Sequence, residues 1–326
     1  MMPHPSTTRL HDSRCAQAFA DDVQYYLSLQ PRQLPSRHLY DALGSALFEA
    51  ICRLPWYRVT RAETRLLDQY GRRIFRRLDP LSTLVELGPG SGEKLVTLIT
   101  SGRSRPAPLQ VHLVDVSAAA LDSASRLLGL LEGISVVAHH ATYEVGLAEV
   151  ALRTRTSGRT LVLFLGSNIG NFDPPGADAF LRGIRAALVP GEAFLMGADL
   201  VKEERELLSA YDDPLGVTAA FNRNLLLRIN RELGGDIDLD RFAHRAIWNA
   251  AESRVEMHLV SLKNQQITVP AAALDFTIGE GESIWTESSY KYQPAGLVSA
   301  LERAGFKLAD QWVDGESGFA LTLVEV

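Results

Sequence analysis

Apolar positions along the chain recur with two different spacings, and the changes of spacing divide the chain into segments. Over the first sixty residues the spacing is helical and predicts helices at about 12–30 and 39–54. From residue 83 onwards, short apolar runs are separated by stretches of helical spacing. These runs predict strands at 83–87, 110–115, 134–138, 160–165 and 193–198. Strands that alternate with helices predict an α/β fold, with a parallel sheet covered by helices on both faces.

The spacing changes again between about 202 and 286, which indicates an α+β insert. The predicted elements of this insert are a helical stretch at 203–233 and short strands at 246–249, 254–260 and 266–269. Beyond it the α/β pattern resumes. A helix is predicted at 293–305, followed by a hairpin of two strands at 306–313 and 319–326. Such a hairpin adds antiparallel strands to the sheet.

Two parts of the chain are therefore predicted to form separate domains. We expect a seven-stranded sheet domain from 62–201 and 292–326, and a second lobe of α+β type from 9–61 and 202–291. Thr60 and Glu63 have the spacing of a capping box, which predicts the start of a helix that ends near residue 78.

Composition and charge exclude several classes of protein. The chain of 326 residues is 46% hydrophobic and 22% charged, as is usual for a globular protein. Its net charge of −6 disfavours binding to nucleic acid, which requires a basic surface. No apolar run approaches the ~20 residues that span a bilayer, and the N-terminus lacks the apolar core of a secretory signal. We expect a cytoplasmic protein with no membrane association.

Neither the two cysteines nor the eight histidines form a metal-binding pattern. The pair His139-His140 lies at a predicted strand end without a matching carboxylate motif, and we expect it at the surface.

Glycines and acids at two strand ends predict a nucleotide-like ligand. The segment LVELGPGSGEK at 84–94 places Gly88, Gly90 and Gly92 directly after an apolar run that contains Glu86. Glycine permits a sharp turn and a close approach of a ligand to the main chain. Asp115 ends the next predicted strand, where a carboxylate can accept hydrogen bonds from two ribose hydroxyls. Together they predict a nucleoside site on a doubly wound sheet.

The terminal hairpin indicates which nucleoside. A dinucleotide-binding domain normally adds further parallel units, and the chain lacks the catalytic His or Tyr-x-x-x-Lys arrangement of an NAD dehydrogenase. The glycine spacing, Asp115 and the hairpin together resemble a class I S-adenosylmethionine methyltransferase.

Five segments sharpen this resemblance. They are YDALGSALF at 40–48, RLPWYRVTR at 53–61, FLGSNIGNF at 164–172, YDDPLGVTAAFNRN at 211–224 and TESSYKY at 286–292. In sequence and order they resemble the histidine Nα-methyltransferases of ergothioneine biosynthesis, which convert histidine to its trimethyl betaine, hercynine. The resemblance covers nearly the whole chain. It implies S-adenosylmethionine as cofactor, S-adenosylhomocysteine as product, and histidine with its mono- and dimethyl forms as substrates.

The resemblance also implies the residues of the cofactor site. Gly88 and Lys94 would lie at the glycine turn, Asp115 would bind the ribose, and Gly166 would lie at the end of the fourth strand. The family's usual acid after the third strand is replaced at Thr142-Tyr143. Thr142 can still accept a hydrogen bond from adenine, but as a neutral group.

A second set of residues is implied for the amino acid, at a site expected between the lobes. By resemblance, Asn171 and Tyr211 would bind the α-amino and carboxylate groups, and the Tyr40 hydroxyl would lie near the methylated nitrogen. We expect Tyr40 and Asn171 to act in catalysis, since the amine must be oriented in line with the S–CH3 bond.

Imidazole recognition would fall to a third set. Glu287 would accept from the ring N–H, a hydroxyl of Ser289 or Tyr57 would serve the other nitrogen, and Met257 would line the pocket. Relatives often carry Tyr-Tyr-Pro where this chain has Trp-Tyr-Arg at 56–58, so the stiffness of this loop is expected to differ.

Two alternatives stay open. An N-methyltransferase of another aromatic amino acid, such as tryptophan, would share the scaffold, although Glu287 with Ser289 favours histidine. A non-catalytic binding protein for an amino acid or S-adenosylmethionine is disfavoured by Tyr40, Asn171 and Tyr211. We expect a monomer.

Overall fold

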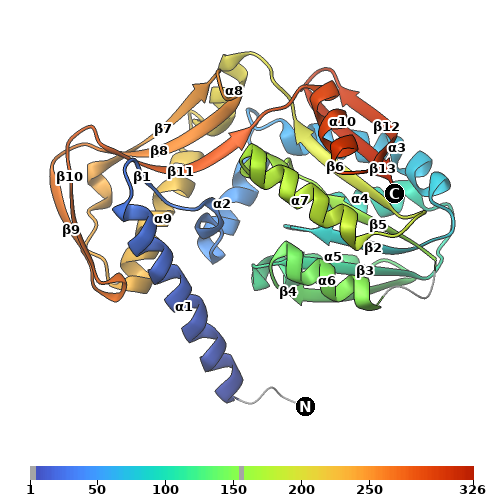
Figure 1. The fold of residues 1–326 in the computed structure, drawn as a ribbon, viewed down its shortest axis with the longest axis horizontal. Helices are drawn as coiled ribbons and strands as arrows, with labels where there is room; N and C mark the ends of the chain where they lie inside the picture. Colours follow the sequence, from blue (N-terminus) through green and yellow to red (C-terminus); the bar gives the residue numbers. More distant parts are fainter. Residues whose placement is uncertain (1–4, 154–157) are drawn as a thin grey trace. The chain divides into compact units, whose positions relative to one another are not determined.

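The computed structural model describes residues 5–153 and 158–326, with side chains from residue 16 onwards except 152 and 153 (Figure 1). Residues 1–4 of the N-terminal segment and the side chain of Cys15 lie outside this description. The chain forms two compact units. The larger unit comprises Cys52–Glu203, Ala250–Arg254 and Ser289–Val326, and the smaller unit comprises the chain up to Ile51, Glu204–Asn249 and Val255–Ser288.

A seven-stranded sheet is the centre of the larger unit, as the sequence predicts. Its strand order is β12-β13-β6-β5-β2-β3-β4. The strands are β2 (Leu81–Leu87), β3 (Leu109–Asp115), β4 (Ile134–His140), β5 (Arg159–Phe164), β6 (Ala193–Asp199), β12 (Lys307–Asp314) and β13 (Phe319–Glu325). The five strands from β6 to β4 are parallel, and β13 pairs antiparallel with both β6 and β12. The carboxyl ends of β5, β2, β3 and β4 therefore lie side by side at one edge.

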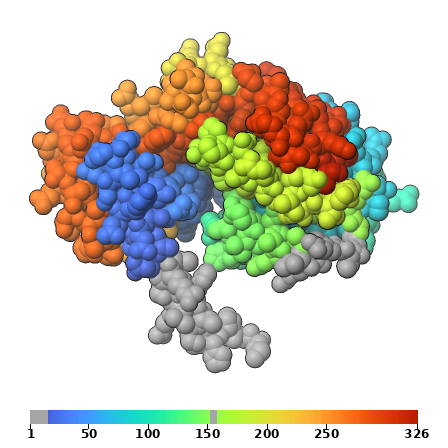
Figure 2. Space-filling view, viewed as in Figure 1, coloured from blue at the N-terminus to red at the C-terminus, as the bar shows by residue number. Residues whose placement is uncertain are grey.

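Helices cover both faces of this sheet (Figure 1). They are α3 (Val59–Arg77), α4 (Glu93–Gly102), α5 (Ala118–Leu128), α6 (Tyr143–Arg153), α7 (Pro174–Ala187) and α10 (Pro294–Arg303). Apolar side chains of α6, α7 and α10 share one core with β2, β5 and β6. Figure 2 shows α7 in yellow-green and the region of α10 in red on the surface of the larger unit. Local sequence sets the starts of two helices. The Ser117 hydroxyl accepts from the Ala120 N–H at α5, and the Asp173 carboxylate accepts from the Gly176 N–H at α7.

The smaller unit combines helices with two small sheets. Its helices are α1 (Pro5–Ser28), η1 (Ser36–Leu39), α2 (Ala42–Arg53, which runs into the larger unit), α8 (Glu204–Tyr211), α9 (Val217–Leu233), η3 (Leu239–Arg241) and η4 (Pro270–Ala272). Its strands are β1 (Arg32–Gln33), β7 (Phe242–Asn249), β8 (Arg254–Ser261), β9 (Gln265–Val269), β10 (Leu274–Ile278) and β11 (Ser283–Tyr290). One sheet has the order β1-β11-β8-β7, and β9 pairs with β10 in the other.

Two details of the insert differ from the prediction. The single helical stretch expected at 203–233 is two helices, because Pro214 and Gly216, which has φ +72°, interrupt it. Strands β10 and β11 were not among the predicted strands. Within the described residues, no helix is long and apolar enough to cross a lipid bilayer.

Candidate functional site

The glycine turn after β2 is crowded by two polar side chains. Gly88 has φ +76°, and its N–H donates to the Val114 carbonyl over 2.9 Å. A Cβ at this position would lie 3.0 Å from both Asn168 Nδ2 and Tyr143 Oη. Gly88 and Tyr143, predicted as site residues, are therefore neighbours, and Asn168, for which no role is predicted, joins them.

Asp115 ends β3, beside the glycine turn, because β2 and β3 are adjacent parallel strands. Its Oδ1 accepts from the Ser117 N–H over 2.8 Å. Burial raises the pKa of this carboxyl, and the N–H groups of Ser117 and Val116 offset only part of that shift. Thr142 lies one strand further along, exposed, directly before α6. The edge of the sheet thus brings Gly88, Asp115 and Thr142-Tyr143 together on successive strands.

Lys94 is anchored by Glu63, the acid whose spacing predicted a helix cap. Glu63 is fully buried, and its Oε2 lies 2.8 Å from Lys94 Nζ. The Gly166 N–H donates to both Glu63 oxygens, over 3.0 and 2.8 Å. The predicted capping box of Thr60 and Glu63 is therefore wrong, since α3 starts at Val59 without a side-chain cap and Glu63 points instead to the cofactor-site residues.

This arrangement fixes the charge of Lys94. Burial alone would lower the pKa of the ammonium, but the charge of Glu63 and its hydrogen bond outweigh burial and raise it. Lys94 therefore stays cationic, although only 21% of its side chain is exposed.

A second buried acid, Glu86, lies in β2 near the same residues. Both of its carboxylate oxygens are buried without a hydrogen-bond partner in the part of the chain that the structure describes. Burial raises the pKa of Glu86 to about 8; Lys94 opposes this shift, and Glu63 and Asp115 add to it. At neutral pH the group is therefore mainly protonated, and a cationic ligand at the turn would favour its ionised form.

The loop after β5 packs against the end of β11 within the larger unit. Asn171 is the last residue of η2 (Asn168–Asn171). A Cβ on Gly170 would lie 2.7 Å from the Tyr290 carbonyl and 3.5 Å from Ser289 Oγ, so only glycine allows this approach. The structure thus places the loop that carries Asn171 next to Ser289.

The loop that carries Tyr57 is held by an arginine. Tyr57 is buried just before α3. The Arg61 guanidinium donates to the Leu54 carbonyl over 2.8 Å and to the Pro55 carbonyl over 2.6 Å. These two bonds restrict the loop between α2 and α3.

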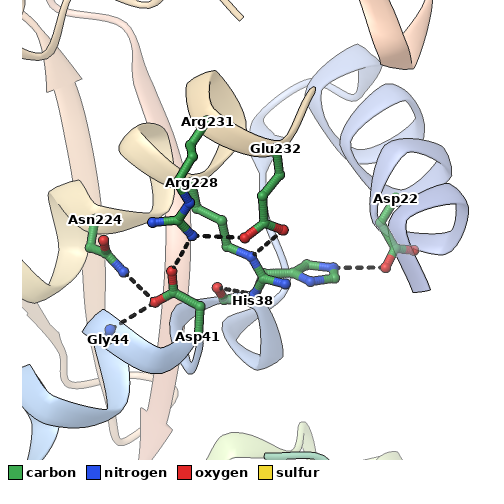
Figure 3. Close-up of polar contacts among 8 residues, drawn as sticks. All are labelled: Asp22, His38, Asp41, Gly44, Asn224, Arg228, Arg231 and Glu232. Carbon is green, nitrogen blue, oxygen red and sulfur yellow. Dashed lines mark hydrogen bonds and ion pairs between the residues drawn. The ribbon is translucent and has the colours of Figure 1, made fainter. Parts of the chain in front are cut away.

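In the smaller unit, Tyr40 follows η1 and packs its ring edge-on against two phenylalanines. Its ring centroid lies 5.5 Å from those of both Phe48 and Phe221. Its neighbours along the chain are fixed by a polar network (Figure 3). The Asp41 carboxylate accepts from Gly44 N–H over 2.7 Å, from Asn224 Nδ2 over 2.7 Å and from Arg231 over 2.6 Å.

His38, two residues before Tyr40, is fixed as well. The His38 carbonyl accepts from the Arg228 guanidinium over 2.9 Å. The imidazole Nε2 of His38 lies 2.8 Å from the Asp22 carboxylate (Figure 3). Burial lowers the pKa of His38 to about 4, against the opposing effect of Asp22. The backbone on either side of Tyr40 is therefore held to α9 and α1.

Tyr211 and Met257 are linked by a buried network. His244 Nε2 lies 2.8 Å from the Tyr211 carbonyl, and its Nδ1 lies 2.9 Å from Asn222 Nδ2. Since a carbonyl only accepts, Nε2 carries the proton, and burial lowers the pKa of this histidine. The Thr286 hydroxyl lies 2.7 Å from Asn222 Oδ1 and 3.0 Å from the Met257 carbonyl.

An aspartate two residues after Tyr211 fixes the turn between α8 and α9. Burial opposes ionisation of Asp213, but hydrogen bonds from Thr218, Val217 and Leu215 outweigh it and lower the pKa. This explains why an acid stands between the two helices.

Glu287 and Ser289 lie two residues apart in β11, so their side chains project from the same face of that strand. The Glu287 carbonyl accepts from the Trp285 indole N–H over 2.8 Å. Glu287 is half-buried and Ser289 is buried.

One expectation about histidines is wrong. His139 is buried, its Nε2 lies 2.9 Å from His112 Nδ1, and its Nδ1 lies 3.0 Å from Glu149. His140 is exposed, as expected. The described residues contain no group of three or more metal-ligating side chains.

The parallel sheet with an antiparallel terminal hairpin, together with the glycine turn and the acid after the second strand, defines a class I S-adenosylmethionine-dependent methyltransferase. Residues 19–326 match the model of the S-adenosylmethionine-dependent, histidine-specific methyltransferases. The chain belongs to this family.

Proteins with established names that are similar to this chain agree with its assignment to this family. The chain is 40% identical to a histidine N-alpha-methyltransferase of Mycolicibacterium smegmatis over 94% of its own length and 95% of the relative. It is 39% identical to the enzyme of that name from Mycobacterium tuberculosis, over 94% of each chain. It is 26% identical to ergothioneine biosynthesis protein 1 of Schizosaccharomyces pombe, over 87% of this chain and 38% of that protein.

Proposed function

We propose that this protein transfers methyl groups from S-adenosylmethionine to the α-amino group of L-histidine in three rounds, which yields hercynine for ergothioneine biosynthesis. The observation that carries the proposal is the 40% identity to a histidine N-alpha-methyltransferase over nearly the full length of both chains. Glu287 and Ser289, on one face of β11, support histidine over tryptophan because they offer two polar groups to a ring with two nitrogens.

The cofactor is bound by the sheet edge of the larger unit in this proposal. The residues are Gly88, Lys94, Asp115, Thr142, Tyr143 and Gly166. Three features of the described residues fit this ligand. Open space beside Gly90, where a Cβ would meet nothing within 4 Å, admits a close approach to the main chain of the turn. The Asp115 carboxylate can accept from ribose hydroxyls, and the Glu86 carboxyl can ionise beside a cation.

The smaller unit is the substrate-binding lobe in this proposal. Asn171 and Tyr211 hold the α-amino and carboxylate groups, Tyr40 orients the nitrogen, and Tyr57, Met257, Glu287 and Ser289 surround the imidazole. When bound, the sulfonium supplies an electrophilic methyl group. The residues of this chain orient the neutral amine toward it, and one proton leaves the nitrogen in each round.

The test is a methyl-transfer assay across the free amino acids, with mass spectrometry of the products. Histidine should gain three methyl groups, and S-adenosylhomocysteine should form in a ratio of three to one. Calorimetry should show that histidine binds with and without S-adenosylhomocysteine. Trimethylation of tryptophan but not histidine would overturn the proposal, and binding of both ligands without transfer would indicate a non-catalytic protein.

We further propose that the enzyme acts as a cytoplasmic monomer on free histidine without a nucleic-acid partner. The net charge of −6 supports the last point, because a nucleic-acid surface must be basic.

A further inference from the structure

Glu86 is an acid in the middle of the central sheet that makes no hydrogen bond through its side chain. It lies in β2, two residues before the glycine turn, and is fully buried. Both of its carboxylate oxygens lack a hydrogen-bond partner among the described residues. Opposite it on the two neighbouring strands stand Leu113 of β3 and Leu163 of β5, which are fully buried as well. These surroundings give a carboxylate no compensation for the loss of water, so they favour the neutral acid.

Charged groups from three elements act on Glu86. Lys94 of α4 favours its ionised form, whereas Glu63 of α3 and Asp115 at the end of β3 favour its neutral form. Lys94 and Glu63 form an ion pair over 2.8 Å, so their opposite charges largely offset each other at Glu86. Burial raises the pKa of the Tyr143 phenol, which follows β4, so that this group stays neutral. In the described part of the larger unit, the free protein therefore holds Glu86 mainly protonated at neutral pH.

The proposed cofactor and its product differ by one charge. S-adenosylmethionine has a sulfonium cation where S-adenosylhomocysteine has a neutral thioether, and both have the same ammonium and carboxylate groups. Two strand residues span about 7 Å, so a ligand at the glycine turn is within electrostatic range of Glu86. Unit charges about 10 Å apart, at an effective dielectric constant of about 20, change an ionisation equilibrium by roughly tenfold or more. The sulfonium therefore favours ionisation of Glu86, and the thioether does not.

We propose, on the basis of the proposed function, that Glu86 is a proton-linked counter-charge that distinguishes the sulfonium cofactor from its thioether product. Glu86 releases its proton to solvent when the cofactor binds, and its carboxylate then stabilises the cation. Glu86 takes up a proton from solvent again once the sulfur has become neutral. The product thereby loses an attraction that the cofactor has. Glu86 acts on the cofactor through its charge and is not a catalytic residue.

The test is calorimetry at pH 7 in two buffers of different ionisation enthalpy, which counts the protons released per ligand bound. The ligands are S-adenosylmethionine and S-adenosylhomocysteine, whose α-amino groups are both mainly protonated at this pH. The wild-type protein should release most of one proton with S-adenosylmethionine and little with S-adenosylhomocysteine. Glu86→Gln keeps the shape of the side chain but has no proton to lose, so it should release the same number of protons with both ligands. The matched control is Glu93→Gln, an exposed acid at the start of α4, which should keep the wild-type difference.

The ratio of the affinities for the two ligands gives a second readout. Binding that releases a proton becomes tighter as pH rises, until the group is already ionised in the free protein. The preference of the wild-type protein for S-adenosylmethionine, relative to that of Glu86→Gln, should therefore increase roughly tenfold between about pH 6 and pH 8 and then level off. A merely structural role of Glu86 would weaken both ligands together and leave this ratio independent of pH.

Equal proton release with both ligands in the wild-type protein would overturn the inference, because Glu86 would then respond to the ammonium group that they share. An unchanged difference between the ligands in Glu86→Gln would overturn it as well. If Glu86→Gln does not fold, as judged by circular dichroism, Glu86→Met takes its place, since it leaves no polar atom in the apolar site. Failure of the proposed function looks different, because the wild-type protein would then not methylate histidine, whatever its proton count.

Discussion

Replacing Glu63 tests whether the ion pair with Lys94 is buried as the structure shows. Glu63→Ala would leave Lys94 without its carboxylate and would remove both acceptors of the Gly166 N–H. Breaking a buried ion pair by removing one partner costs about 3–5 kcal/mol of unfolding free energy. Since 21% of the Lys94 side chain is still exposed, water can partly replace the lost partner. We therefore expect about 3 kcal/mol, the low end of that range.

The assay is urea unfolding, followed by circular dichroism, with binding of S-adenosylmethionine measured by calorimetry. Glu63→Gln keeps an oxygen for the Gly166 N–H but removes the charge, so it should lose less stability while still weakening cofactor binding through Lys94. The matched control is Glu93→Ala, an acid next to Lys94 in the chain. Its ion pair with Arg53 spans 3.7 Å between side chains that are 78% and 65% exposed. Such a pair contributes about 0–1 kcal/mol. If Glu63→Ala and Glu93→Ala have equal effects, the reasoning about the buried pair is refuted.

Three further perturbations have expected outcomes. Asp115→Ala should remove hydrogen bonds to a charged acceptor and weaken the binding of S-adenosylmethionine, measured by calorimetry, roughly tenfold or more. Unchanged affinity would mean that another acid binds the ribose. Glu287→Ala should lower kcat/KM for histidine by a factor equivalent to about 1.5–3 kcal/mol and leave kcat/KM for tryptophan unchanged or higher, whereas Asn171→Ala should lower kcat/KM for both substrates. An unchanged ratio of the two kcat/KM values in Glu287→Ala would remove the support for ring recognition. Burial lowers the pKa of His38 to about 4, so the unfolded chain takes up the proton first as pH falls below about 6.5. The free energy of unfolding should therefore drop by roughly 3 kcal/mol between neutral pH and pH 4. His38→Gln should reduce this drop in urea unfolding, and an unchanged pH dependence in the variant would count against the role of His38.

The sequence predicts the sheet of the larger unit because each of its strands is a short apolar run between helical stretches. The glycine turn and the caps at Ser117 and Asp173 are also readable, since each depends on residues within a few positions of one another. Glu63 was misassigned because its partner, the Gly166 N–H, lies 103 residues further along the chain. Its local spacing fits a capping box equally well.

The polar networks of the site were missed for the same physical reason. Asn222, His244 and Thr286 meet only when α9, β7 and β11 fold together. Lys291 lies within the segment TESSYKY at 286–292, but its ion pair with Asp199 forms only when β6 and β11 fold together. The division of 203–233 into two helices had a local signal in Pro214 and Gly216 that could have been used.

The position of β13 between β6 and β12 has a consequence during synthesis on the ribosome. β6 is complete at Asp199, but its antiparallel neighbour begins only at Phe319, so the chain between them must be made first. At about 5–20 residues per second, this leaves one side of β6 unpaired for roughly 6–24 s. An unpaired, apolar strand edge invites pairing with other chains. A nascent chain of this protein therefore passes through an interval in which it depends on chaperones or on rapid folding of the intervening segment.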